Sequence, residues 1–190
     1  MITSFNVIIF LKAFQKTRIG SAINTAMNAW YLEAQRLIGT AEIPGARHDP
    51  TILGWAKKLG SAILGIAVTD DETAWCGLFV AHCIAEAGLT PAPIAVRASS
   101  WSSWGSNLQA ERLAPGAILV FARPGGGHVG FYVGEDATAY HVLGGNQSNK
   151  VCITRIEKSR CVARRWPTCV PVIGGPIGLK TSGSVSSNEA

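Results

Sequence analysis

Three segments of the sequence carry side chains whose types and order suit nucleophilic catalysis. Cys76 lies in the segment DETAWCGLFV, where a loop is predicted to become a helix, His128 lies in GGHVG and Asn146 lies in GGNQ. A helix dipole and a neighbouring imidazole both favour the thiolate form of a cysteine. An amide such as that of Asn146 can hold the second ring nitrogen of a histidine and so select one tautomer. The three residues therefore predict a cysteine nucleophile, its base and an orienting group, as found in hydrolases.

Each of these residues also has a purely structural interpretation. A cysteine beside a tryptophan at a helix start often serves only packing, and a histidine in a glycine-rich turn is often solvated. The catalytic interpretation is supported by where the three residues are predicted to lie. Cys76 is at a helix start, His128 at a strand start and Asn146 at a strand end. In that arrangement the backbone N–H of Cys76 is a natural half of an oxyanion hole.

The elements that would position these residues follow from the hydrophobic pattern. Period 3.6 predicts helices over residues 28–38, 51–59, 75–87 and 95–104. Thr73 is the expected N-cap of the helix that carries Cys76. From residue 117 the period changes to two, which predicts strands over 117–121, 128–133, 139–143, 150–156 and 161–166. Helices followed by an antiparallel meander are typical of the α+β class, with N-terminal helices packed on a small sheet of about five strands.

The composition is that of one globular domain with a basic surface. The chain has 190 residues, of which 47% are hydrophobic and 15% charged, and a formal net charge of +5. We expect an N-terminal extension over residues 1–28, a catalytic domain over 29–170 and a flexible Gly/Ser-rich tail over 171–190. A basic protein is attracted to polyanions such as nucleic acid, anionic lipid and cell-wall polymers. Its basic residues are scattered, so a nucleic-acid groove is not expected.

The N-terminal extension has two interpretations. It contains Lys12, Lys16 and Arg18, and the apolar run over 7–14 is too short to cross a bilayer. The basic residues follow the apolar run, which is the wrong order for a secretory signal. The segment is either an additional amphipathic or floppy extension, or a helix that makes weak contact with a membrane surface.

Other motifs are weak. The five cysteines form no C-x-x-C pair, so a zinc site is not expected, and Cys83, two helical turns after Cys76, is predicted to pack in the core. The pattern Gly125-x-Gly127-x-x-Gly130 matches a dinucleotide fingerprint. The segment after it alternates like a strand, however, and the fingerprint requires a helix there.

Three blocks resemble a known family. Residues 73–80 (TAWCGLFV), 127–131 (GHVGF) and 142–149 (VLGGNQSN) are similar to the motif blocks of CHAP-like amidase domains in the NlpC/P60 superfamily, especially a branch found in phage lysins. The resemblance runs from about Trp30 to Pro167. One departure is Gly116-Ala117, where the superfamily strand usually reads Gly-Asp.

The resemblance implies a papain-like fold, a peptidoglycan substrate and amide-bond cleavage that needs no metal or other cofactor. Cys76 corresponds to the nucleophile, His128 to the base and Asn146 to the third polar residue. Candidate substrate contacts are Trp75, Trp101, Trp104, Gln147 and Glu42. Core or lid packing is the alternative role of the second and third tryptophans.

The leading hypothesis is a cysteine peptidoglycan hydrolase of the endolysin type, either an N-acetylmuramoyl-L-alanine amidase or a stem-peptide endopeptidase. We expect a monomer that acts at the bacterial cell wall, is made in the cytoplasm and is exported by a route that the sequence does not identify. One alternative is a catalytically silent wall-binding or virion-associated module. Another is an interbacterial toxin amidase of the same fold.

Overall fold

The computed structural model describes residues 28–45, 47–180 and 184–189. The expected extension over residues 1–28, with its membrane contact, lies outside this range apart from residue 28. The helices are α3 (Ala29–Arg36), α4 (Pro50–Leu64) and α5 (Cys76–Glu86), with short 3-10 helices η1 (Ala98–Ser103), η2 (Ala110–Arg112) and η3 (Lys158–Arg160). The strands are β1 (Ser106–Asn107), β2 (Ile118–Arg123), β3 (Gly126–Glu135), β4 (Ala139–Gly144), β5 (Cys152–Glu157) and β6 (Cys161–Trp166).

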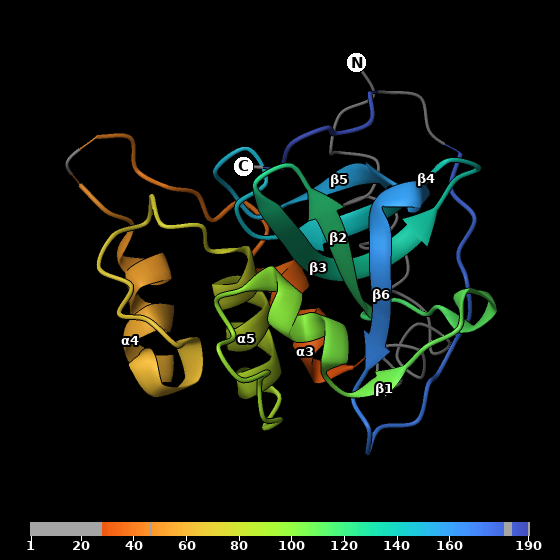
Figure 1. The fold of residues 1–190 in the computed structure, drawn as a ribbon, viewed down its shortest axis with the longest axis horizontal. Coiled ribbons are helices and arrows are strands. Elements are labelled where there is room, and N and C mark those ends of the chain that lie inside the picture. The colour runs from red at the N-terminus through yellow and green to blue at the C-terminus, as the bar shows by residue number, and fades with distance from the viewer. Residues whose placement is uncertain (1–27, 46, 181–183, 190) are drawn as a thin grey trace, which may run out of the picture.

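The strands form one antiparallel sheet in the order β1-β6-β2-β3-β4-β5. The helices lie on one side of this sheet, with α4 outermost (Figure 1). This arrangement confirms the α+β class. Within the described residues the sheet has six strands rather than the expected number of about five, because β1 has only two residues and so offers no alternation for a pattern to detect.

Helix α5 is the centre of the core. Its side chains Leu78, Phe79 and Val80 are fully buried, and Cys83 is buried as predicted. The helix contacts α3, α4 and β3, and at β3 the Phe79 and Phe131 rings pack edge to face with centroids 5.9 Å apart. A helix that is apolar around most of its circumference requires cover on several sides. The packing of α5 therefore fixes its first residue, Cys76, against the sheet.

Helix α4 is longer than predicted. Asp49 caps its start by accepting hydrogen bonds from the N–H groups of Thr51 and Ile52, and Pro50 occupies the first turn. Gly60 has non-helical angles (φ 74°, ψ 163°), so the helix is kinked there and continues to Leu64. The hydrophobic pattern predicted a helix that ends at residue 59, because Gly60 interrupts the helical period there.

One further expectation changes, and another is not tested. The segment predicted as a helix over 95–104 is the 3-10 helix η1, which is shorter and tighter. Where it is described, the chain after residue 171 lies against the sheet, since Gly178 bridges Glu135 and Ser186 bridges Ile156, and its flexibility stays a prediction. None of the helices in the described part of the chain has the length and apolarity to cross a membrane.

Candidate active site

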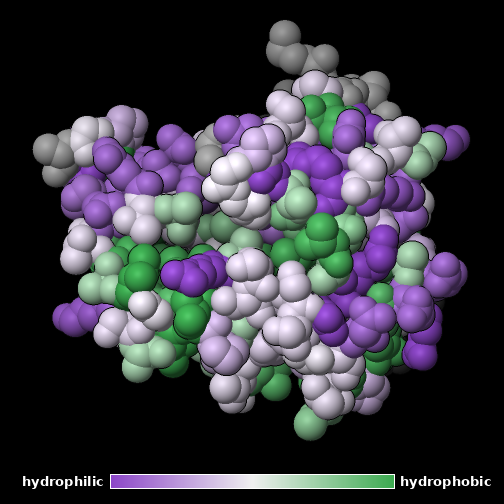
Figure 2. Space-filling model, in the orientation of Figure 1, coloured by the Kyte–Doolittle hydropathy of each residue, from purple (hydrophilic) through white to green (hydrophobic). Residues whose placement is uncertain are grey.

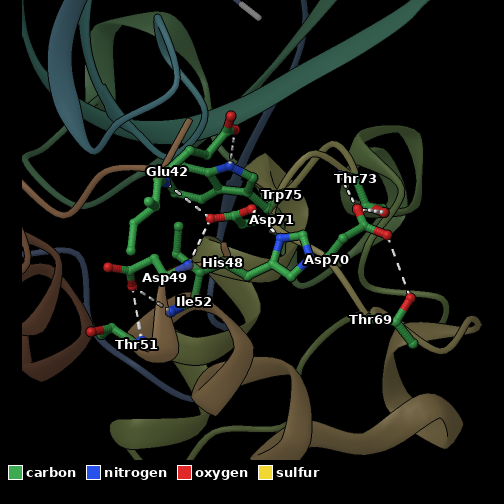
Figure 3. Close-up of polar contacts among 11 residues, drawn as sticks. Glu42, His48, Asp49, Thr51, Ile52, Thr69, Asp70, Asp71, Thr73 and Trp75 are labelled. Carbon is green, nitrogen blue, oxygen red and sulfur yellow. Dashed lines mark hydrogen bonds and ion pairs between the residues drawn. The ribbon is translucent and has the colours of Figure 1, made fainter. Parts of the chain in front are cut away.

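The loop that leads into α5 is held by a buried carboxylate. Asp71 is fully buried and accepts hydrogen bonds from His48 Nδ1 (2.8 Å), the Asp49 N–H (2.8 Å) and the Ile43 N–H (3.2 Å), as Figure 3 shows for His48 and Asp49. Burial raises the pKa of Asp71, but these hydrogen bonds outweigh burial and hold the pKa below its ordinary value. Asp71 is therefore ionised at neutral pH and joins the 43–49 loop to the approach to Cys76.

Trp75 also ties this approach to the 43–49 region. Its Nε1 donates to Glu42 Oε1 over 2.6 Å (Figure 3), and its ring is fully buried beside that of Trp55. Burial raises the pKa of Glu42, and the charges of Asp71 and Glu72 act in the same direction, while the hydrogen bond from Trp75 opposes them. The structure thus places Trp75 as a packing and positioning residue, with no exposed surface for the substrate contact that the sequence suggested.

The start of α5 differs from the expected N-cap. The helix begins at Cys76 with Trp75 in the N-cap position, and both the N–H and the hydroxyl of Thr73 bond to Asp70 Oδ1 over 2.7 Å. Thr73 therefore belongs to a turn before the helix. At Gly77 an added Cβ would collide with the carbonyl oxygens of Ala95 and Val96. This close approach requires glycine next to Cys76.

Cys76 lies where α5 meets β3. Its side chain is 5% exposed, and the N–H of Val129, the residue after His128, points to its sulfur. Burial raises the pKa of the Cys76 thiol, opposed by the Val129 N–H, the charge of Arg123 and the Gly77 N–H. Burial wins, so the thiol is protonated at neutral pH and can serve as a nucleophile only where a base removes its proton.

His128, near the start of β3, has a fixed tautomer. Its Nε2 lies 3.0 Å from Gln147 Oε1, and Gln147 Nε2 donates to the carbonyl oxygens of Val142 and Cys152. Because those carbonyls can only accept, the amide nitrogen must face them and the amide oxygen must face the ring. The His128 Nε2 therefore carries the hydrogen, and Nδ1 has the free lone pair.

The charge state of His128 follows from its burial. Burial lowers the pKa of His128 to about 4, and the charge of Glu189 and the hydrogen bond to Gln147 oppose the shift only in part. The ring is neutral at pH 7. A neutral imidazole with an unprotonated Nδ1 can act as a general base.

The expected hydrogen bond between Asn146 and His128 is not found among the described residues. The Asn146 Oδ1 is buried and has no hydrogen-bond partner among the described residues, while the neighbouring Gln147 holds His128. Asn146 adopts a left-handed backbone conformation (φ 53°) that turns the chain. Asn146 lines a separate cavity of about 450 Å³ together with Glu42 and Glu72. Gln147, expected to contact substrate, is a positioning residue for the imidazole.

The thiol opens onto a cleft of about 640 Å³. The lining includes Cys76, Arg97, Ala98, Arg123, Gly126 and Gly127. Hydrophobic residues reach the surface over α4 and over the sheet in the face drawn in Figure 2, with hydrophilic residues between them. A cleft of this size with two arginines suits a peptide-sized ligand that carries negative charge.

The tryptophans of the η1 region belong mainly to the core. Trp101 is fully buried and its Nε1 donates to the Ala95 carbonyl over 3.0 Å. Trp104 is partly buried, donates to the Thr90 carbonyl and packs on Trp101 with centroids 5.4 Å apart. Core packing, the alternative weighed for these residues, therefore accounts for Trp101, which is not available as a substrate platform.

Gly144 gives a test of the His128–Gln147 pair. A Cβ at this position would lie 2.9 Å from both His128 Nε2 and Gln147 Oε1. For the cysteine hydrolase that the motif blocks predict, we expect Gly144→Ala to push these groups apart and to lower kcat/KM about 10²-fold. Steady-state kinetics with soluble muropeptides measures this effect. Gly54→Ala is the control, because a Cβ on this exposed residue of α4 meets open space and should leave kcat/KM unchanged.

Asp71 gives a test of the approach loop. Asp71→Asn places an amide NH₂ against groups that donate hydrogen bonds, so we expect a loss of roughly 2–3 kcal/mol in the free energy of unfolding, measured with urea. The folded carboxyl has a lowered pKa, so its contribution is complete above about pH 4 and disappears as the pH falls through the folded pKa. Asp70→Asn keeps its acceptor oxygen for Thr73 and is the control. Equal stability of the two variants would contradict the role of Asp71.

Sequence reasoning missed Asp71, Gly144 and the orienting role of Gln147. The only signal for Gln147 was its place beside Asn146 in the GGNQ segment, and the contacts of Asp71 come from residues more than twenty positions earlier. A comparison of the chain with models of known protein families gives no match, and a comparison with curated proteins gives no significant match.

Proposed function

We propose that this protein is a cysteine hydrolase of peptidoglycan amide bonds with a CHAP-like, papain-like fold in the NlpC/P60 superfamily. The observation that carries the proposal is the amide of Gln147, fixed by two carbonyl oxygens, which holds the hydrogen of the His128 ring on Nε2 and leaves the lone pair on Nδ1. The thiol of Cys76 lies beside the next residue of the same strand. Strongly perturbed pKa values cluster at functional sites, so the lowered pKa of His128 beside a thiol supports a catalytic role.

The chemistry follows from these charge states. His128 Nδ1 accepts the Cys76 proton as the sulfur attacks the amide carbonyl carbon. The tetrahedral intermediate collapses when His128 returns the proton to the leaving nitrogen and the C–N bond breaks. Water, deprotonated by His128, then attacks the thioester, releases the carboxylic acid and restores the thiol. The N–H groups at the start of α5 are the nearest candidates for stabilising the oxyanion.

The choice of substrate rests on charge and on the motif resemblance. The net charge of +5 and the two arginines that line the cleft favour an anionic polymer. Peptidoglycan with its attached acidic polymers is an anionic polymer of this kind. Its stem peptides contain amide bonds that a cysteine hydrolase can cleave. The N-acetylmuramoyl-L-alanine bond and the bonds within the stem peptide both remain candidates for the scissile bond.

One observation favours the second candidate, a catalytically silent wall-binding or virion-associated module. Cys76 is only 5% exposed and burial raises its pKa, as expected for a packing cysteine. Digestion of purified peptidoglycan followed by mass spectrometry of the products separates the two candidates. New free amines and carboxylates at one bond type support the enzyme and identify the bond, whereas an unchanged polymer that retains the protein supports the module.

The pH profile tests the base. His128 must be neutral to accept the thiol proton, and its pKa is lowered to about 4. We therefore expect kcat/KM to stay constant down to about pH 5 and to fall tenfold per pH unit below about pH 4. An acid limb near the ordinary histidine value of about 6.5 would show that the imidazole is solvated in the free enzyme.

A further inference from the structure

The segment over residues 184–189 ends at the catalytic end of the sheet. In Figure 1 its dark blue trace passes over the top of the sheet and stops beside the ends of β2 and β3. Asn188 Oδ1 accepts from Arg123 on β2 over 2.7 Å. The Glu189 carbonyl accepts from the N–H of Ser148 over 2.9 Å, and Ser148 follows Gln147, the partner of His128.

The carboxylate of Glu189 is held by a two-pronged contact. Its two oxygens accept from Arg160 Nη1 and Nη2, each over 2.8 Å, and the side chain is fully buried. A bidentate arginine contact is the strongest geometry that a protein offers a carboxylate. Its charge acts on the buried imidazole of His128.

The Arg160 guanidinium group also has a hydrogen bond that does not involve Glu189. Arg160 Nε donates to the Ala122 carbonyl at the end of β2 over 3.0 Å, which fixes the guanidinium plane. Arg123 stands beside it, and its buried Nε has no partner in the described part of the chain. Arg123 also lines both the Cys76 cleft and a second cavity of about 390 Å³ that includes Arg160. The two spaces therefore meet at Arg123.

The segment is held by polar contacts rather than by apolar packing. Its sequence, SVSSNE, contains one small apolar side chain, and its hydrogen bonds include those to main-chain groups and to the two arginines. It therefore lacks the burial of large hydrophobic groups that would stabilise a permanently docked segment. Segments with few buried apolar contacts are among those that open locally at low free-energy cost.

We infer that Arg160, Arg123 and the Ser148 N–H form a carboxylate-binding subsite next to the catalytic pair, and that residues 184–189 occupy it as an internal competitor of the substrate. This inference rests on the proposed function for the identity of the external ligand, a peptidoglycan stem peptide with a free carboxylate. The subsite itself rests on the contacts of Glu189.

The test measures binding in the full-length chain by isothermal titration calorimetry. The first probe is the acetylated, amidated hexapeptide SVSSNE, with SVSSNQ as its uncharged match. The second probe is a stem peptide with free carboxylates, and its amidated form is the uncharged control. For this probe every chain also carries Cys76→Ala, which prevents turnover. The variants are Glu189→Ala, the double variant Glu189→Ala with Arg160→Gln, and Glu111→Ala, an exposed glutamate, as the control for charge.

We expect Glu189→Ala to bind both charged probes at least about tenfold more tightly than the unaltered chain. In the unaltered chain the internal ligand leaves the site free for only a small fraction of the time, and the apparent affinity falls in proportion to that free fraction. The affinity for the uncharged probes should be the same in Glu189→Ala as in the unaltered chain. The double variant should not bind the charged probes more tightly than the unaltered chain does. Glu111→Ala should have the affinities of the unaltered chain. If Glu189→Ala binds neither charged probe more tightly, the inferred subsite is ruled out and residues 184–189 have only a structural role. If the hexapeptide gains and the stem peptide does not, the subsite stands and the proposed substrate fails.

Discussion

Replacing Cys76 with alanine is expected to reduce peptidoglycan hydrolysis to background while the fold persists. The sulfur is the proposed nucleophile, and the alanine side chain has no group that can form the covalent intermediate in its place. The substitution removes one buried atom, so the free energy of unfolding should fall by only roughly 1 kcal/mol. Turbidity loss of purified cell walls and release of soluble muropeptides measure the activity.

Cys83→Ala is the matched control for this prediction. Cys83 is a free, fully buried cysteine two turns further along the same helix, so its loss removes the same atom from the same core. It should cost similar stability and leave hydrolysis intact. Retained turnover in Cys76→Ala, or equal loss in both variants, would contradict a nucleophilic role for Cys76.

Replacing Gln147 with alanine is expected to lower kcat about 10²-fold with little change in KM. The variant removes the acceptor that holds the hydrogen on His128 Nε2, so the imidazole can rotate and exchange tautomers. Nitrogen chemical shifts of the His128 ring provide a readout that a purely structural residue would not move. In the unaltered chain they should report hydrogen on Nε2 alone, and in Gln147→Ala a mixture of tautomers.

Asn146→Ala separates the two neighbouring amides. Asn146 lines a different cavity and its oxygen makes no hydrogen bond within the described residues, so we expect less than a threefold change in kcat and an unchanged ring spectrum. A larger loss in Asn146→Ala than in Gln147→Ala would restore the role that the motif resemblance gives to Asn146.

Much of the fold was predictable because its signals are local. The apolar residues of 75–87 recur around a helix, and the strands of 117–166 alternate with turn residues between them, so helix α5 and strands β2 to β6 were expected close to their true bounds. Strand β1 and the extension of α4 beyond Gly60 were not, because a two-residue strand and a kinked glycine carry no periodic pattern.

The candidate site divides in the same way. The sequence by itself determined that a thiol stands at a helix start and an imidazole near a strand start, since both depend on neighbouring residues. The tertiary structure alone decided which amide holds the imidazole, because a left-handed turn at Asn146 directs adjacent side chains to different places. It also decided the contacts of Asp71 and Glu189, whose partners lie 22 to 41 residues away along the chain. Contacts over such separations depend on how helices and sheet pack, and no local pattern encodes that packing.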